Sequence, residues 1–182
     1  MDFEQARFNM VEQQIRPWEV LDQDVLDLMS TIRREDFVPP AYRTLAFADA
    51  QVPLGHGAAM LPPKIEAKLL QELQLRKADK VLEIGTGSGF MAALLGAKAD
   101  QVFSVEIVPE LAEFARENLR RAGIENVSVV IGDGARGWPE HAPYDVIVVS
   151  ASLPLVPQDM LDQLKPGGRL AAIVGDPPAM QA

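Results

Sequence analysis

The stretch VLEIGTGSG, residues 81–89, joins an apolar run to a turn with a glycine at every second position. The apolar run predicts a buried strand, and residues 90–98 continue as a helix. Glycine permits a sharp turn and lets a ligand approach the backbone without a Cβ in the way. The backbone N–H groups of the turn and the start of the helix then face that ligand. The stretch therefore predicts a strand–turn–helix unit with a binding loop, and a purely structural turn is the alternative.

Strands and helices alternate along the chain after this unit. The predicted strands are apolar at nearly every position and cover residues 80–84, 101–106, 127–131, 144–150 and 169–174. Helices are predicted between them at residues 90–98, 109–122 and 158–164. Continuous apolar strands are typical of a parallel sheet with helices on both faces, and right-handed crossovers make such a sheet doubly wound. The expected fold class is α/β, with a doubly wound, mainly parallel, Rossmann-like sheet.

The chain before residue 79 has a different pattern. Helices are predicted at residues 3–15, 22–33 and 64–74, because apolar positions recur three and four residues apart. Residues 35–63 are rich in proline and glycine, which disfavours long regular structure. A length of 182 residues fits one domain. We expect that single domain, 1–182, to consist of an N-terminal helical segment with a cofactor-covering loop (1–78), a core (79–175) and a tail (176–182).

Composition and charge exclude several classes of protein. Hydrophobic residues make up 48% of the chain and charged residues 24%, as is typical of a globular domain. No apolar run approaches the roughly 20 residues that span a bilayer, and the first residues predict no signal peptide. The net charge of −9 disfavours nucleic acid as a partner, so the pairs Arg33–Arg34 and Arg120–Arg121 are expected on solvated helix faces. The absence of cysteine fits a reducing cytoplasm.

Two acids complete the expected ligand site. Glu106 ends the second predicted strand, 17 residues after Gly89, where a carboxylate can accept hydrogen bonds from a ribose diol. Asp133 follows the third strand between two glycines, where a carboxylate can accept from an adenine amino group. A solvated strand-end charge and a simple turn aspartate are the alternatives. The G-x-G-x-G spacing disfavours a pyrophosphate and hence a nicotinamide cofactor. An adenosine without phosphate, as in S-adenosylmethionine, fits best.

The sequence resembles a known family along residues 8–175. The segments VLEIGTGSGF, VEIVPELAEFAR, NVSVVIGDGARGWPEHAPYDVIVVSA and QLKPGGRLAAIVG resemble class I S-adenosylmethionine-dependent methyltransferases. The segments MVEQQI, REDFVPPAYR and ADAQVPLGHG narrow this resemblance to the protein-L-isoaspartate (D-aspartate) O-methyltransferases. The resemblance implies a sheet order 3-2-1-4-5 and an enzyme that methylates isoaspartyl carboxylates in damaged proteins, a protein repair. It also implies S-adenosyl-L-methionine as methyl donor and S-adenosyl-L-homocysteine as product.

The resemblance also implies site residues. The loop residues Gly85, Thr86, Gly87, Ser88 and Gly89 would cradle the amino acid part of the cofactor. Glu106 would hold the ribose hydroxyls, Ile107 would pack on the adenine, and Asp133 and Gly134 would contact the adenine edge. Ser150, Ala151 and the turn to Val156–Pro157 would shape the mouth of the site.

One departure from the family pattern affects the acceptor pocket. Where the family usually reads Gln-Thr-Ile-Ser-Gln-Pro, this chain reads AAMLPP at residues 58–63. Leu61 takes the place of the family serine and Ala59 that of the threonine, so two hydroxyls are lost. His56 is a weak substitute, more typical of a surface loop, and the catalytic residue stays unassigned. A methyltransferase with another acceptor, or a cofactor-binding module without isoaspartyl activity, therefore remains open beside the repair enzyme.

Two further expectations concern the chain end and metals. The family adds an antiparallel hairpin after the fifth strand, whereas this chain ends shortly after residue 175, so we expect the hairpin to be missing and the tail to be a truncation. No metal site is expected, because His56 and His141 lie far apart and the carboxylates show no ligand spacing. His141 lies in a loop and is expected to be solvated. The oligomeric state is not readable from the sequence.

Overall fold

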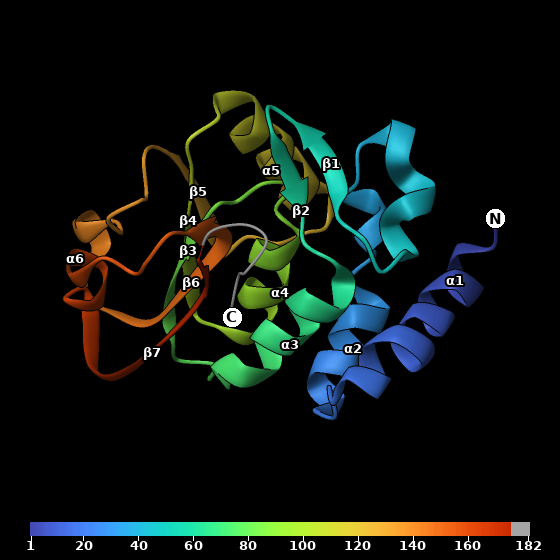
Figure 1. Ribbon diagram of the computed structural model, residues 1–182, viewed down its shortest axis with the longest axis horizontal. Helices are drawn as coiled ribbons and strands as arrows, with labels where there is room; N and C mark the ends of the chain where they lie inside the picture. The colour runs from blue at the N-terminus through green and yellow to red at the C-terminus, as the bar shows by residue number, and fades with distance from the viewer. Residues whose placement is uncertain (176–182) are drawn as a thin grey trace.

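A five-stranded parallel sheet forms the centre of the molecule (Figure 1). The computed structural model describes residues 1–175, so the tail expected at 176–182 lies outside the described residues. The strands are β3 (Lys80–Ile84), β4 (Gln101–Glu106), β5 (Val127–Ile131), β6 (Tyr144–Leu153) and β7 (Leu164–Val174). Their order is β5-β4-β3-β6-β7, and every neighbouring pair is parallel. This order is the 3-2-1-4-5 order expected from the sequence, which is confirmed.

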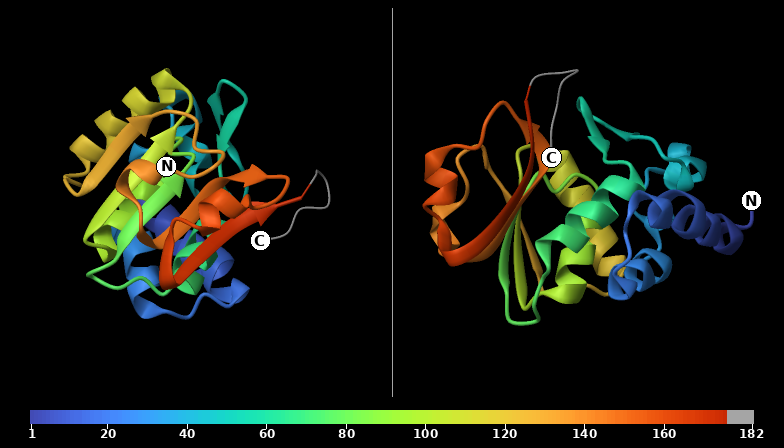
Figure 2. Two further views of the ribbon diagram at one scale, coloured as in Figure 1. Left: turned by 90° about the vertical axis from the view of Figure 1, so that its left-hand side faces the viewer. Right: turned by 60° about the horizontal axis from the view of Figure 1, so that its bottom comes forward.

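Helices cover both faces of the sheet, but unequally. One face packs against α3 (Pro63–Leu73), α4 (Phe90–Lys98) and the N-terminal segment, while α6 (Gln158–Leu161) lies on the other (Figure 2). Side chains alternate between the faces along each strand: Val146 and Val148 join the larger core, Ile147 and Val149 the smaller one. Burial on both faces explains why these strands are apolar at almost every position.

The N-terminal segment is mostly helical, as predicted. Helix α1 (Phe3–Met10) continues as a π-helical turn and then a 3-10 turn up to Trp18, and α2 covers Gln23–Thr31. Residues 34–47 form two short 3-10 helices. A hairpin of β1 (Val52–Gly55) and β2 (Ala58–Met60) follows, which the sequence analysis did not predict. Strands of four and three residues are too short to show an alternating pattern.

Several boundaries and the placement of Arg34 differ from the sequence predictions. Strand β6 extends three residues beyond the predicted end at Ser150, and α6 ends at Leu161 rather than at residue 164, where β7 already begins. Arg34 was expected on a solvated helix face, and this expectation is wrong, because the side chain is fully buried. Arg120 and Arg121 are exposed as expected.

Among residues 1–175, no helix is long and apolar enough to cross a membrane.

Helix α4 lies between the sheet and the N-terminal segment, so its packing should dominate stability. Leu94 of α4 is completely buried in the larger core. We expect Leu94→Ala to lower the free energy of unfolding by about 2–5 kcal/mol, because it removes apolar contacts and leaves a cavity. Urea unfolding measures the change. The matched control is Leu155→Ala, whose side chain is 68% exposed and should change stability by less than about 0.5 kcal/mol.

Candidate functional site

The glycine loop, residues 85–89, lies where β3 ends and α4 begins. Gly85, Gly87 and Gly89 have φ values of 90°, 56° and 83°, a region that side chains rarely adopt. A Cβ on Gly85 would lie 3.1 Å from the Cβ of Ala151, at the carboxyl end of β6. The loop therefore needs glycine both for its turn and for its close approach to β6, at the edge where doubly wound folds bind ligands.

Glu106, at the carboxyl end of β4, holds the glycine loop in place. Its Oε2 accepts a hydrogen bond of 2.8 Å from the backbone N–H of Gly87, and its Oε1 accepts one of 3.0 Å from that of Val108. The residue is 5% exposed. Each carboxylate oxygen has two lone pairs, so each can accept a second hydrogen bond from a bound diol. The carboxylate thus links the loop to the position expected for a ribose.

The residues predicted around an adenine lie beside Glu106 in the sequence or follow β5. Ile107 is 64% exposed, although it directly follows a buried strand. Gly134 is buried, and a Cβ there would lie 2.7 Å from Ile84 Cδ1. Asp133 is exposed, and its Oδ1 accepts from the N–H of Ala135 at 2.9 Å, so the carboxylate also shapes the turn. An exposed apolar side chain and a tightly packed glycine fit a flat aromatic ligand at this edge.

A buried carboxylate that the sequence analysis missed lies beneath the loop. Glu83 is completely buried in β3, and its two oxygens accept hydrogen bonds from Ser104 Oγ at 2.5 Å and Ser150 Oγ at 2.7 Å. The hydroxyl of Thr86 is 2.6 Å from Ser104 Oγ, so it turns into this network. Burial, partly offset by the serine hydrogen bonds, raises the pKa of Glu83 from 4.5 to about 7. An acid within an apolar strand was the signal in the sequence.

The β1–β2 hairpin places residues 58–63, the segment that differs from the family pattern, against the glycine loop. A small cavity has Ala59, Leu61 and Glu66 on the N-terminal side, and residues 85–88 with Ser150 on the other. A Cβ on Gly87 would lie 3.2 Å from Leu54 of the hairpin, which shows how closely the two sides approach. The two positions where family hydroxyls are replaced therefore both border the predicted cofactor loop.

Neither histidine takes part in this cavity. His56 is exposed at the tip of the hairpin, with a positive φ of 53°. His141 was expected to be solvated, but its ring stacks on that of Phe103 with a centroid distance of 4.0 Å, so that expectation is wrong. Within residues 1–175, no group of three His, Cys, Asp or Glu side chains could hold a metal ion.

A parallel sheet of this order, with a glycine-rich loop after its first strand and an acid ending its second, defines a class I S-adenosylmethionine-dependent methyltransferase. The family model of protein-L-isoaspartate(D-aspartate) O-methyltransferase matches residues 5–182. This chain belongs to that family. The enzyme class, an S-adenosylmethionine-dependent O-methyltransferase of the isoaspartyl type, is thereby confirmed, as is the cofactor.

Individual relatives agree with the family assignment. A protein-L-isoaspartate O-methyltransferase from Methanoculleus marisnigri is 49% identical over 169 residues, which cover 93% of this chain and 77% of the relative. One from Myxococcus xanthus is 49% identical over 156 residues, covering 86% and 74%.

Solved structures give the same result for the fold. A protein-L-isoaspartate O-methyltransferase has a TM-score of 0.77 at 34% identity, and the match covers 92% of this chain but 54% of that one. A putative member from Plasmodium falciparum, solved with S-adenosyl-L-homocysteine, also has a TM-score of 0.77, at 20% identity, covering 99% and 87%. At that identity the second likeness concerns the fold alone.

The buried Glu83 predicts a pH dependence of stability. Because its pKa is raised in the folded state, the folded protein holds this proton more tightly than the unfolded chain does. The contribution of Glu83 to the free energy of unfolding is therefore fully present below about pH 4.5 and is lost as the pH rises through about 7. Relative to the wild type, Glu83→Gln should gain on the order of 3 kcal/mol in free energy of unfolding across this window.

Urea unfolding of both proteins at intervals between pH 5 and 8 measures this difference. The comparison cancels the groups that do not interact with Glu83. A difference that stays constant over the whole range would show that Glu83 does not titrate there.

Proposed function

We propose that this chain transfers a methyl group from S-adenosylmethionine to the isoaspartyl carboxylate of damaged proteins and releases S-adenosylhomocysteine. The observation that carries this proposal is the cavity between the β2–α3 segment and the glycine loop, which brings Leu61 against residues 85–88. A methyl donor held by the loop would reach an acceptor held by the segment. The family assignment supports the same reaction.

We propose that the cofactor occupies the carboxyl ends of β3, β4 and β5. The positive φ values of the loop glycines form a tight turn at this edge, and Glu106 retains acceptor capacity for the ribose diol. Ile107 would pack on the adenine, with Asp133 and Gly134 at its edge. The residues fit the group, because a buried carboxylate and backbone N–H groups suit a diol and a carboxylate without any phosphate site.

S-adenosylmethionine supplies an activated methyl group on a sulfonium. The acceptor carboxylate is ionised near neutral pH, so transfer to it requires no general base. The protein then has to hold the acceptor in line and exclude water, and positioning of this kind can supply most of the acceleration. The apolar side chains of Ala59, Met60 and Leu61 line the cavity and would favour the exclusion of water once an acceptor is bound. This role explains how the site can work without the family serine.

The same apolar wall favours a second candidate, a methyltransferase of this family with a different, less polar acceptor.

We also propose that residues 1–78 act as the cover of the core within one domain, because their hairpin closes the cavity. A reducing, cytoplasmic location is proposed from the absence of cysteine.

Cofactor binding depends on Glu106 in this proposal. We expect Glu106→Gln to weaken binding of S-adenosylhomocysteine by about 10- to 100-fold, because the amide has one acceptor oxygen where the carboxylate has two. Isothermal titration calorimetry measures the change. Glu110→Gln is the matched control, since it removes the same charge from an exposed position four residues away and should leave the affinity unchanged. Equal affinities of both variants would refute the assignment of Glu106.

The acceptor is tested by radiolabelled methyl transfer to an isoaspartyl peptide and its aspartyl twin. We expect the wild type to methylate the isoaspartyl peptide alone. Leu61→Ser should raise that rate by about 5- to 150-fold, because it restores a hydroxyl beside the acceptor. Ala58→Ser adds the same group outside the cavity lining and serves as control. No transfer to either peptide by protein that binds the cofactor would favour the different acceptor.

A further inference from the structure

Arg34 is buried where few charged side chains are found. It is 0% exposed and heads the fully buried side chains of the described residues by size. Burial lowers the pKa of Arg34 to about 9, so the guanidinium remains charged at neutral pH. A buried charge is costly unless it is paired and hydrogen-bonded on every side. The contacts of Arg34 therefore indicate the role of its buried charge.

Arg34 contacts four separate segments. Its Nη1 forms an ion pair with Glu66 of α3, whose side chain is also buried. Its Nε donates to the carbonyl of Ala46 at 2.9 Å, and its Nη2 donates to the carbonyl of Leu61 at 2.7 Å. The guanidinium carbon lies 5.0 Å from the centre of the Phe90 ring. One side chain thus joins parts of the chain that are up to 56 residues apart in sequence, from 34 to 90.

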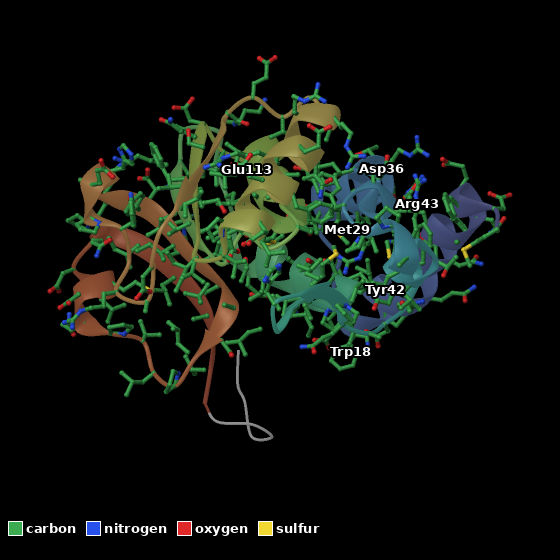
Figure 3. The ribbon with its side chains drawn as sticks, turned by 90° about the horizontal axis from the view of Figure 1, so that it is seen from above. Trp18, Met29, Asp36, Tyr42, Arg43 and Glu113 are labelled. Carbon is green, nitrogen blue, oxygen red and sulfur yellow. The ribbon has the colours of Figure 1, made fainter. Side chains whose placement is uncertain are left out.

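Two of these four contact residues line the proposed acceptor cavity. Leu61 and Glu66 both line it, and Phe90 is the first residue after the glycine loop on its opposite side. The segment that carries Arg34 is itself held, because Asp36 and Arg43 form an ion pair of 2.5 Å on its surface, where they lie side by side (Figure 3). Arg34 thus links the Leu61 carbonyl to Phe90, the residue that follows the glycine loop.

We propose that Arg34 is a positioning residue for methyl transfer: through the Leu61 carbonyl and Glu66 it holds the acceptor side of the cavity at a set distance from the glycine loop. It touches no reacting atom in this role. The proposal rests on the proposed function only for its activity measurement, and its structural part stands on the contacts of Arg34.

The planar fork of arginine is needed for this task. Its nitrogens reach Ala46, Glu66 and Leu61 at once, whereas lysine offers one compact ammonium group. Stability alone would not require the pair, because replacing a buried ion pair with apolar residues is often neutral or stabilising. The fork therefore contributes a defined geometry at the cavity.

The test compares the wild type with Arg34→Lys and with the double variant Arg34→Met/Glu66→Met. We expect kcat/KM for the isoaspartyl peptide to fall about 10- to 100-fold in both, because the Leu61 hydrogen bond is lost. The affinity for S-adenosylhomocysteine, measured by calorimetry, should stay within about twofold. Hydrogen exchange of the backbone N–H groups of residues 58–61 should become faster, which is a readout independent of activity.

Arg7→Lys is the matched control. Arg7 is 4% exposed and pairs with the buried Glu35, but it does not line the cavity. It should leave the peptide kinetics and the exchange of residues 58–61 unchanged.

The proposal is overturned if folded variants keep the wild-type peptide kinetics, or if they lose cofactor affinity in parallel with activity. It is also overturned if hydrogen exchange of residues 58–61 stays as slow as in the wild type, or if both Arg34 variants fail to fold. If the wild type transfers no methyl group, the proposed function fails, and the exchange measurement alone decides the role of Arg34.

Discussion

The hydrogen bond from the Gly87 N–H to the Glu106 carboxylate ties the turn after β3 to the end of β4. The turn that makes this bond needs glycine, because its glycines adopt positive φ values and a Cβ on Gly85 would press against Ala151 of β6. Helix α4 starts directly after the turn, and the N-terminal segment packs on α4. The binding edge, the main core and the cover of the cavity therefore all depend on one strand-to-strand link.

Two buried ionisable side chains, Glu83 and Arg34, lie near that link. Glu83 lies beneath the loop with its oxygens bound by Ser104 and Ser150, and Arg34 lies across the cavity with its nitrogens bound by Glu66 and two carbonyls. Apolar residues would fill both places at a lower desolvation cost. Both groups instead connect segments that meet near the cavity.

Much of the binding edge could be predicted from sequence, because its signals are local. Gly85–Gly89 follow a continuous apolar strand, and Glu106 ends the next one. Some of the missed features depend on contacts between residues distant in sequence, and one depends on very short strands. Arg34 looked like part of a solvated pair, and the hairpin at residues 52–60 was too short for a pattern. His141 looked solvated until its stacking on Phe103 was visible. Arg34 and His141 were missed because their partners are distant in sequence, whereas the hairpin was missed because its strands are short.

Local patterns in the sequence were sufficient for the parallel sheet, its strand order by resemblance, the glycine loop and the replacement of the family serine by Leu61. Strands buried on both faces must be apolar throughout, and a positive φ favours glycine. The residue types along the sequence therefore indicate these features directly. The tertiary structure alone showed where Leu61 lies, that Thr86 turns inward, and which groups form hydrogen bonds with Glu83 and Arg34. Such pairings result from long-range packing, which brings distant side chains together without leaving a periodic trace in the sequence.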